Sequence, residues 1–540
     1  SCFTVVILVY LLGGFHPHTQ TIRHSLLQHQ AMLLPPNIAD LIPPDALVRV
    51  VDKIVDSIDR TLIDDLYPGG GAPAYDPIMM LKLVLYCYSS GIYSSRQIAT
   101  ATTKDLHAMW LTALTPISHN TINRFRSSRI EPVFEKIFTQ VITTLADHGY
   151  LDLSTYFLDG TKIEANANKY SFVWSKSTKR YKANLQAKIH AHLHTIEELN
   201  TSEDLLCDLQ PEHIDSQTLK QVGKYINQRL ADNPKDPALK KADRLVRQEW
   251  TPKLEEYETK EKIAAQRGSY SKTDTDATFM RMKDDPMGNG QLKAAYNIQV
   301  GTSDQFIIDA TVHQRPGDTA CAISHFEHVK KELGSLPATI VADAGYGSEQ
   351  NYAYLENEGV QALVKHNEFF RLMKNKNWRD DPFRVANWPY DSQTDTYTCP
   401  AGRPLTFRCL QNTVSDLGYH SKSRIYQSVS CHDCPLKSKC TKSTKDDFNR
   451  IIKINPTSQA YKDKATVLLR TEEGSRLRKK RSVDVETVFG DIKRNYHFTR
   501  FTLRSLTKVA LEFRWVAMGH NIRKAHKAGQ KDFSEPVNKG

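Results

Sequence analysis

Two short apolar segments, each closed by an aspartate, constrain the fold of this chain most. Residues 153–159 and 338–343 consist mainly of aromatic, β-branched and other apolar side chains, and they end at Asp159 and Asp343. Runs of this length and composition are typical of buried strands. A glycine-containing turn at residues 344–347 follows the second run at once. We therefore predict a sheet in which two strands terminate in carboxylates.

The residues between these two segments predict the rest of an α/β core and one interruption of it. Residues 293–300 and 305–312 have strand-like composition, and the short segment 301–304 between them predicts a hairpin in the same sheet. Residues 175–267 are instead highly charged, poor in glycine and rich in Leu, Lys, Glu and Gln. This composition favours helices, so we predict a helical insertion within the core.

A second, cysteine-containing insertion is predicted over residues 369–470, and a helix is predicted after it. The apolar stripe of that helix consists of Val485, Val488, Phe489, Ile492 and Tyr496. Glu486 lies on the edge of the stripe, and Lys493 follows two turns later along nearly the same line. Gly490, between these two residues, leaves room for a ligand. A last helix is expected from about residue 505, followed by a flexible polar tail over residues 526–540.

The amino-terminal part predicts an all-helical domain over residues 32–148, with an expected role in DNA binding or assembly. Apolar residues recur at helical spacing over 47–58, and further helices are expected over 76–90, from residue 95 and after residue 116. Proline and glycine separate these segments. The remaining, carboxyl-terminal domain is expected to occupy residues 149–525.

Residues 118–129 predict a helix with a basic outer face. Ser118 is a favourable N-cap, and Ile122 and Phe125 are expected to point inward. Arg124 and Arg126 are then expected to remain outside and to contact DNA. Such a helix can enter a major groove. A solvated basic helix in a packing or dimerisation domain has the same pattern, so both interpretations stay open.

Charge and apolar content favour a non-membrane protein with a polyanionic partner. Lys and Arg total 72 against 61 Asp and Glu, which gives a formal net charge of +11. A surplus of this size also fits an ordinary soluble protein of this length. The apolar run at residues 3–12 is too short to span a bilayer and has no basic segment before it, so we expect no membrane partner and a cytoplasmic location. Residues 1–31 precede the helical pattern and are expected to be an extension, either translated upstream sequence or a frayed end.

Asp159, Asp343 and Glu486 form a chemically sensible set for holding two divalent ions. Phosphoryl transfer on DNA requires that negative charge be neutralised on both the attacking and the leaving oxygen, and a pair of hard cations held by carboxylates does this. The short Asp side chain fixes the ions close to a rigid sheet. A longer Glu side chain on a helix can reach across to complete the coordination shell of one ion. Each acid also has an ordinary explanation: the first two as turn caps, the third as a solvated helix residue.

The motifs around these acids resemble those of DDE transposases of bacterial insertion sequences, in the branch named family eleven-eighty-two, related to the insertion-sequence-four-like group. The segments that carry the resemblance are residues 158–168, 172–174, 275–283, 296–299, 343–347 and 483–494. The likeness spans roughly residues 32 to 523. It implies an α/β, RNase H-like core with Asp159, Asp343 and Glu486 as catalytic and metal-binding residues. It also implies two Mg²⁺ or Mn²⁺ ions, hydrolysis at element ends and strand transfer of the freed 3′-hydroxyl into target DNA, by a homo-oligomer on double-stranded DNA.

One motif departs from that wider group. Related transposases carry a Tyr and an Arg shortly before the Glu and a Lys after it. Lys493 fits the last place, whereas Arg481 lies one residue too far upstream and no Tyr precedes it at the usual distance. We expect Arg478, Lys479, Lys480 and Arg481 to substitute as contacts to backbone phosphates, and Lys493 to contact a phosphate near the cut site. A solvated basic helix is the alternative interpretation.

Four clustered cysteines predict a structural zinc site in the second insertion. In a chain without secretory features, clustered thiols favour metal over disulfides. The four are Cys399, Cys431, Cys434 and Cys440. They are enough for a closed tetrahedral site that holds a segment with little core of its own. Cys409 or His432 can replace one ligand, and reduced thiols in a small core are the alternative.

The combined prediction is a metal-dependent DNA transposase with a helical amino-terminal domain and an RNase H-like catalytic domain. Two other classes of protein stay open. One is a catalytically silent DNA-binding regulator derived from a transposase, and the other is a stand-alone nuclease with no joining step.

Overall fold

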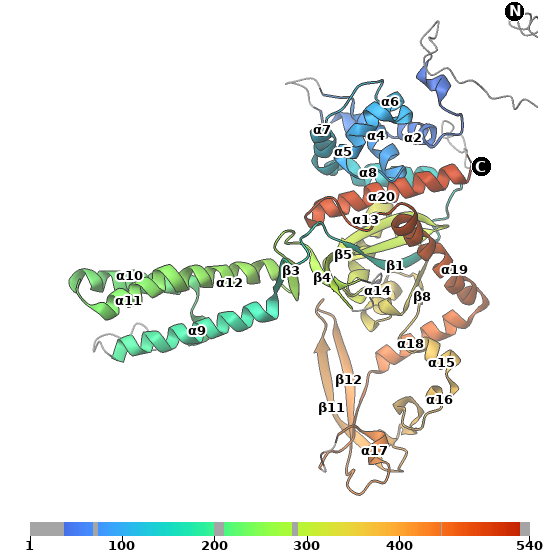
Figure 1. The fold of residues 1–540 in the computed structure, drawn as a ribbon. Coiled ribbons are helices and arrows are strands. Elements are labelled where there is room, and N and C mark those ends of the chain that lie inside the picture. Colours follow the sequence, from blue (N-terminus) through green and yellow to red (C-terminus); the bar gives the residue numbers. More distant parts are fainter. Residues whose placement is uncertain are drawn as a thin grey trace, which may run out of the picture. The chain divides into compact units, whose positions relative to one another are not determined.

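A mixed β-sheet lies at the centre of residues 44–540 (Figure 1). Its strand order is β4-β5-β1-β7-β8, and β6 also pairs with β5. The strands are β1 (Thr155–Glu164), β4 (Thr278–Arg281), β5 (Leu292–Ser303), β6 (Phe306–His313), β7 (Thr339–Ala342) and β8 (Gln361–Val364). Strands β1, β7 and β8 are parallel, whereas β4, β5 and β6 pair antiparallel. The fold is therefore mixed α/β, as predicted.

The computed structural model describes residues 37–67, 74–198, 210–282, 290–443, 445 and 447–529. The predicted extension over residues 1–31 lies outside this part of the chain, as does most of the tail predicted over 526–540. Residues 1–43 and 44–540 form two units. In the first, the short helix η1 (Ile38–Leu41) is capped by the side chain of Asn37.

Strand β1 is longer than the sequence pattern predicts. Asp159 lies within it and does not close it, because the antiparallel pairing with β5 continues as far as Glu164. The parallel pairing with β7 does stop here, at the pair Leu158 and Ala342. Asp159 and Asp343 are thus each the first residue after the last paired residues of β1 and β7, which brings the two aspartates to the same place in the sheet.

The β5–β6 hairpin forms as predicted, but its turn lies later in the sequence. Asp304 and Gln305 have positive φ angles of 49° and 64°, as in a two-residue hairpin turn. Gly301, which was expected in the turn, lies within β5, where a Cβ atom would overlap the ring of Tyr156. The glycine is therefore required by the close approach of a neighbouring side chain.

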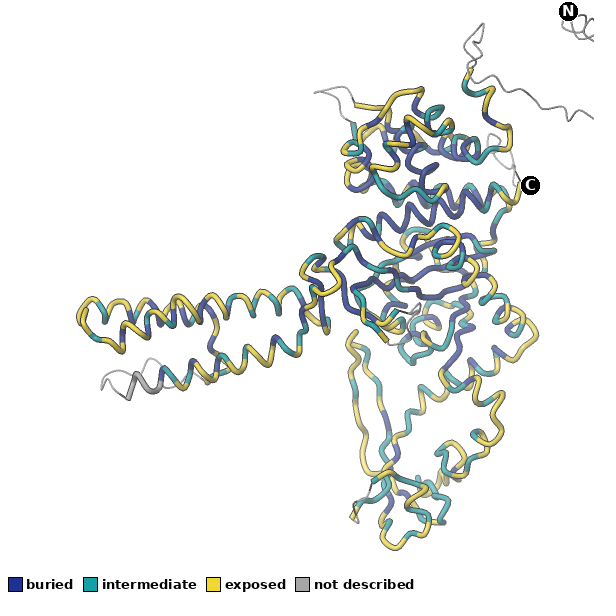
Figure 2. Tube along the Cα trace, in the orientation of Figure 1, coloured by how far each residue is buried: buried dark blue, intermediate teal, exposed yellow. Residues whose placement is uncertain are grey.

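Two helices after the second predicted insertion pack against the sheet. Helix α19 (Glu472–Gly490) contacts β1, β5 and β7, and its Leu477 and Val485 share a buried cluster with Phe157 of β1. Helix α20 (Leu506–Lys527) contacts β6 and is buried along most of its length (Figure 2). These helices fix the region of the sheet that carries the two aspartates.

The amino-terminal region is helical, as predicted. Its main helices are α2 (Leu47–Asp56), α4 (Pro77–Ser89), α5 (Ser95–Lys104), α7 (His119–Arg124) and α8 (Glu131–Asp147). Helix α20 contacts α2, α4 and α8 across the boundary expected near residue 148. A Cβ atom at Gly519 of α20 would lie 3.0 Å from backbone atoms of α4. This close packing joins the region to the rest of the unit.

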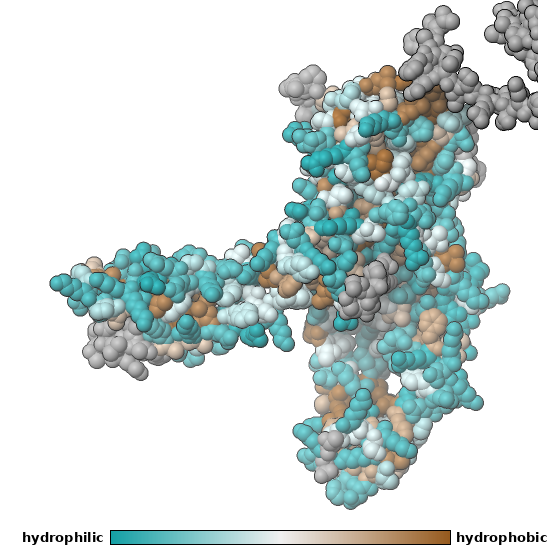
Figure 3. All heavy atoms as spheres, viewed as in Figure 1, coloured by the Kyte–Doolittle hydropathy of each residue, from teal (hydrophilic) through white to brown (hydrophobic). Residues whose placement is uncertain are grey.

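Residues 175–267, where a helical insertion is predicted, form helices α9 (Ser175–Glu198), α10 (Ser216–Asp232), α11 (Pro237–Arg244) and α12 (Thr251–Ala264). The chain enters and leaves this segment through the paired strands β2 (Phe172–Trp174) and β3 (Ser269–Ser271). The helices share a core of their own that includes Trp250 and Leu254. Their visible surface is mostly hydrophilic (Figure 3).

Residues 369–470, the second predicted insertion, contain a separate five-stranded sheet. Its strands are β9 (Tyr390–Asp391), β10 (Thr396–Thr398), β11 (Pro404–Val414), β12 (His420–Ser428) and β13 (Ile451–Ile454). The segment also holds helices α15 (Phe369–Lys374), α16 (Lys376–Arg379), α17 (Lys437–Cys440) and α18 (Pro456–Arg470). The long β11–β12 hairpin is exposed along much of its length (Figure 2). Within the described residues, no helix has the length and apolar content needed to cross a bilayer.

Candidate active site

Asp159 is a nearly buried carboxylate that faces α19. It is 7% exposed, and Phe157, two residues earlier on the same face of β1, packs against α19. One Asp159 oxygen accepts a hydrogen bond from Arg481 Nη1 at 3.0 Å. The other oxygen accepts the N–H of Gly160 at 2.8 Å. The carboxylate is thus held in a fixed position at the centre of the sheet.

Asp343 is more open to solvent than Asp159 and lies at the start of a turn. Its Oδ1 accepts the N–H of Gly345 at 2.8 Å, which caps the short helix η6 (Ala344–Tyr346). Its second oxygen is not used by this cap. A Cβ atom at Gly347 would overlap the backbone of Lys365, so glycine is required where this turn passes β8.

Two cations balance the two aspartates. Arg481 is 7% exposed and pairs with Asp159, and Lys365, also 7% exposed, follows the last residue of β8. Burial lowers the pKa of the Lys365 amino group; Arg481 acts in the same direction, and Asp343 and Asp159 oppose it. Among the residues that the structure describes, the buried Arg481 Nε atom has no hydrogen-bond partner.

A third aspartate, Asp318, lies close to Gly160 and Gly345, which follow the first two aspartates in the chain, and the sequence interpretation missed it. Its Oδ1 accepts hydrogen bonds from Asn297 at 2.8 Å and Gln299 at 3.0 Å, both on β5. Gln299 also accepts a hydrogen bond from the buried hydroxyl of Tyr346. Burial raises the pKa of Tyr346 well above its usual range, and the charges of Asp318, Asp159 and Asp343 add to the effect. The three carboxylates therefore act on one buried tyrosine.

Close packing over Gly160 explains how Asp318 comes so near. Gly160 is paired with Gln299, so a Cβ atom there would lie 2.8 Å from the Gln299 amide nitrogen and would overlap the Asp318 carboxylate. Because Asp159 and Gly160 are consecutive in a strand, their side-chain directions point to opposite faces. Asp318 thus supports β1 from the face opposite Asp159. The Pro-Gly-Asp sequence at residues 316–318 was the available signal, since it marks a turn with an acid directly before a helix.

Glu486 lies on α19 and is exposed. The α19 side chain that forms an ion pair with Asp159 is Arg481. The buried acid of this helix is Asp484, which accepts hydrogen bonds from Thr302 and from the backbone of Gln305 at 2.6 and 3.0 Å. Asp484 thus stabilises the β5–β6 turn, and burial raises the pKa of its carboxyl group.

Lys493 lies in a π-helical turn, η8 (Asp491–Asn495), directly after α19. The sequence interpretation placed Lys493 on the same line as Glu486 by assuming regular α-helical geometry up to residue 493. A π-helical turn holds more residues than an α-helical turn, which rotates Lys493 away from that line. Such turns occur often at functional sites.

The basic run before Glu486 is divided between several environments. Arg478 lies 5.1 Å from the centre of the Phe369 ring and donates to Ser475. Lys480 pairs with Asp304 at 2.7 Å, and Arg481 pairs with Asp159. Lys479 is exposed. The four residues therefore do not present one continuous basic face.

The helix predicted over residues 118–129 forms, with Ser118 as its cap and Arg124 exposed. Arg126 departs from the expectation, because it is buried. Its guanidinium donates to the hydroxyl of Tyr88 and the carbonyl of Tyr93, both at 2.6 Å. It also lies 3.8 Å from the buried carboxylate of Glu512. The helix changes to π-helical geometry at residues 125–129, and Arg126 is a structural residue that is not available to DNA.

Four cysteines of the second insertion, Cys399, Cys431, Cys434 and Cys440, line one cavity. They are described in detail below. Within the described residues, no group of three or more His, Cys, Asp or Glu side chains is already arranged to hold a metal ion. The donors at Asp159 and Asp343 are carboxylate oxygens, which are the ligands that Mg²⁺ and Mn²⁺ prefer.

Two family models match the chain. One, described as a transposase DDE domain, matches residues 398–526, and the other, described as transposase domain DUF772, matches residues 36–128. A comparison with curated proteins finds no match. The two matches support a transposase of the insertion-sequence kind. The first range contains Glu486 and Lys493, whereas Asp159 and Asp343 lie outside both ranges.

Proposed function

We propose that this chain, whose two ends match transposase families, cleaves DNA at the ends of an insertion sequence and joins the freed 3′-hydroxyl to target DNA. The observation that carries the proposal is the position of Asp159 and Asp343 directly after the last pair of residues that joins β1 to β7. Two carboxylates at one point of a sheet, with a helix bearing an acid packed beside them, are suited to phosphoryl transfer on DNA. We further propose that this sheet is RNase H-like.

Asp159, Asp343 and Glu486 would hold two Mg²⁺ or Mn²⁺ ions. When bound, these ions neutralise charge on the attacking and leaving oxygens of the phosphodiester. The carboxylate donors fit such ions, and the sheet fixes Asp159 within a nearly buried position. Glu486 is the longest of the three acids and the most exposed, so its side chain can reorient when DNA is present.

The cations of the site have a second role in this proposal. Lys365 and Arg481 are positively charged groups held at low exposure beside the aspartates. A buried cation acts on a nearby phosphate more strongly than one in water, because water does not screen it. These two residues would therefore orient the scissile phosphate. Lys479 and Lys493 would contact phosphates further along the strand, as would Arg124 of the amino-terminal region.

The expected partners are double-stranded DNA, at the element ends and in the target, and further copies of this chain. Cutting two ends and joining them to one target requires at least two active sites acting together, which favours a homo-oligomer on DNA. The net charge of +11 supports binding to a polyanion. A cytoplasmic location, with binding to the bacterial nucleoid, follows from this proposal.

The test uses the full chain and a labelled DNA fragment that carries the end of the element beside its gene. With Mg²⁺ or Mn²⁺, we expect a strand break that leaves a 3′-hydroxyl at the element end, and a slower product in which this end is joined to a second DNA. A scrambled end is the control and should give neither product.

The alternatives give different outcomes in the same assay. Specific binding to the end without any break would identify a DNA-binding regulator, and a break without any joined product would identify a nuclease. Either result would overturn the proposed function.

A further inference from the structure

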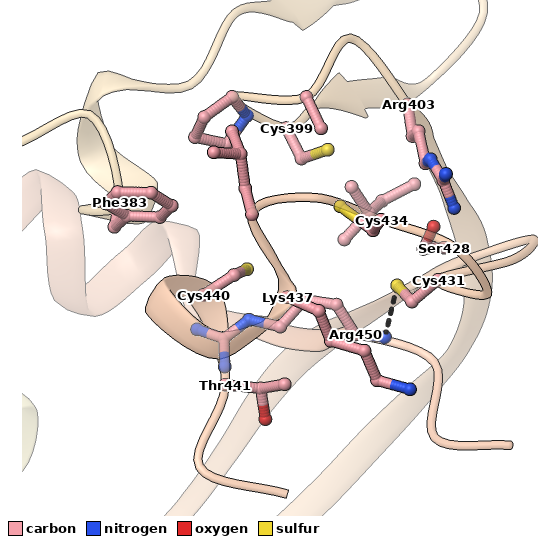
Figure 4. A pocket seen from close by; sticks show the side chains of 14 residues that line it. Phe383, Cys399, Arg403, Ser428, Cys431, Cys434, Lys437, Cys440, Thr441 and Arg450 are labelled. Atoms are coloured by element: carbon pink, nitrogen blue, oxygen red, sulfur yellow. Dashed lines mark hydrogen bonds between the residues drawn. The ribbon is translucent and has the colours of Figure 1, made fainter. Parts of the chain in front are cut away.

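A cavity at the base of the β11–β12 hairpin takes no part in the proposed reaction. Its volume is about 20 Å³, and its lining includes Cys399, Cys431, Cys434 and Cys440. We call it the four-thiol cavity. Figure 4 shows the four thiols around the same space.

Three separate segments of the chain bring these thiols together. Cys399 begins a tight turn that Gly402 closes, with the Gly402 N–H donating to the Cys399 carbonyl at 2.8 Å. Cys431 and Cys434 lie on a second turn, and Cys440 ends the short helix α17. The convergence of residues 41 positions apart therefore depends on the tertiary fold and is not an accident of local spacing.

Hydrogen bonds hold the two turns against each other. Arg403 Nη1 donates to the carbonyl oxygens of Ser430 and His432 at 2.9 and 2.8 Å, so it connects the Cys399 turn to the Cys431 turn. The backbone N–H of Arg450 donates to Cys431 Sγ at 3.2 Å (Figure 4). Hydrogen bonds of this kind orient a ligand and stabilise negative charge on its sulfur.

The structure also distinguishes the four cysteines from Cys409 and His432, the two alternative zinc ligands that the sequence suggested. Cys409 is exposed on β11 and does not line the cavity. The His432 side chain is 72% exposed and contacts Asp433 at 2.6 Å. Neither residue belongs to the four-thiol cavity.

The segment around the cavity has little apolar core to stabilise it. Its buried cluster consists of Trp388, Leu405, Tyr426 and Ile452. A small core of this size seldom supports a fold without a disulfide or a structural metal. The four cysteines are free thiols.

We propose that Cys399, Cys431, Cys434 and Cys440 bind one structural Zn²⁺ ion as a tetrahedral set of thiolates. Each thiol releases a proton to solvent on binding, and the sulfurs close to about 2.3 Å from the ion. Arg403, Lys437 and Arg450, which also line the cavity, offset the negative charge of a four-thiolate zinc centre. This inference does not depend on the proposed function.

The site fixes the base of a hairpin whose far end reaches the catalytic region. At the turn of the hairpin, Tyr419 donates to Glu349 and Ser415 donates to Gln350, both at 3.0 Å. Asp416 lies 3.7 Å from Arg315, three residues before Asp318. Zinc at the base therefore sets the position of a strand pair that ends beside the active-site loop.

The experiment measures metal in the full-length protein, purified without chelator and without added zinc. We expect close to one zinc per chain by elemental analysis. We also expect that Co²⁺ exchanged into the protein gives the visible absorption of a tetrahedral thiolate site. Cys434→Ser and Cys440→Ser should each lose most of the metal, because a hydroxyl is a poor zinc ligand. Cys409→Ser is the matched control and should retain it.

Limited proteolysis distinguishes a zinc site from a metal-free core lined by reduced thiols. Removal of zinc by a chelator should expose the β11–β12 hairpin to cleavage, and restored zinc should protect it again. A wild-type protein with almost no zinc and a protease-resistant hairpin would overturn the proposal. So would retention of zinc by both Cys434→Ser and Cys440→Ser. A failure of DNA cleavage with zinc present would count against the proposed function only.

Discussion

Arg481 of α19 and Asp159 of β1 form a buried ion pair, with 3.0 Å between Nη1 and Oδ2. The pair lies where the proposed divalent ion would bind, so a cation of the protein competes with the metal for one carboxylate. A metal ion that binds Asp159 must replace Arg481 as the cation that balances its negative charge. The Arg481 guanidinium is then free to bind an anion in the site.

Arg481→Gln is therefore expected to bind Mn²⁺ more tightly than the wild type, by about three- to tenfold or roughly 1 kcal/mol, because Asp159 no longer exchanges one cation for another. Calorimetric titration without DNA measures this affinity. Lys480→Gln is the matched control, since the neighbouring Lys480 pairs with Asp304 and not with Asp159. An unchanged or weaker affinity in Arg481→Gln would show that the ion pair does not compete with metal.

Replacement of the three proposed catalytic acids should stop cleavage and spare binding to the element end. Asp159→Asn, Asp343→Asn and Glu486→Gln each keep the shape of the side chain and remove a charge that an ion requires. We expect a loss of at least about 100-fold in cleavage, with less than a threefold change in end binding by gel shift.

Glu486 gives the sharpest of these three tests, because it is exposed, whereas Asp159 is nearly buried. Glu473→Gln, in the exposed first turn of the same helix, is its control and should cleave normally. Near-normal cleavage by Glu486→Gln would remove Glu486 from the proposed set.

The salt dependence of DNA binding should distinguish the basic residues of α19. Lys479 is exposed, and its replacement by Ala should lower the slope of log affinity against log salt by about 0.9 if it contacts a duplex phosphate. Lys480 pairs with Asp304, so Lys480→Ala should have a smaller effect. Fluorescence anisotropy at several salt concentrations measures both slopes. Equal slopes for Lys479→Ala and the wild type would place Lys479 away from the DNA.

Asp491 should contribute to stability over most of the pH range. Burial opposes its charge, but hydrogen bonds from His520 and Arg523 outweigh this and hold the pKa of Asp491 below its ordinary value of 3.8. Because the pKa is lower in the folded chain, the contribution is present above pH 3.8 and is lost as the pH falls below it. Asp491→Asn should lose about 2 kcal/mol of unfolding free energy at pH 7.

Urea unfolding at several pH values tests the expectation for Asp491. The difference between Asp491→Asn and the wild type should be constant from pH 8 to pH 5 and should shrink only near and below pH 3.8. Asp463→Asn, on exposed α18, is the control and should unfold like the wild type. A difference that disappears between pH 7 and pH 5 would contradict the assignment.

The sequence predicted those elements of the fold that depend on neighbouring residues, such as helix caps and apolar strands. Ser118 caps the helix that it was expected to cap, and the strands that precede Asp159 and Asp343 form where apolar runs indicated them. Features that depend on a distant partner could not be predicted. Strand β1 continues past Asp159 only because β5, more than a hundred residues later, pairs with it.

The same limit applies to the candidate site. The helical pattern places Arg126 on the outer face of its own helix. In the structure it is buried, because it pairs with Glu512 and donates a hydrogen bond to Tyr88, both on other helices. Asp318 and Lys365 lie far from Asp159 in the sequence, and only the tertiary fold brings them to the same part of the sheet. The motifs therefore identified candidate acids, whereas the cations and supporting residues required the tertiary structure.

The packing of α20 has a consequence for the order in which the protein can be completed during synthesis. Trp515 of α20 lies between the amino-terminal helices, 4.2 Å from the ring centre of Phe134 and 5.9 Å from that of Tyr88. Phe134 and Tyr88 leave the ribosome about 400 residues before Trp515 does. Until α20 emerges, the nascent chain has an uncovered aromatic surface, so the amino-terminal helices reach their final packing only after the whole central sheet has been made.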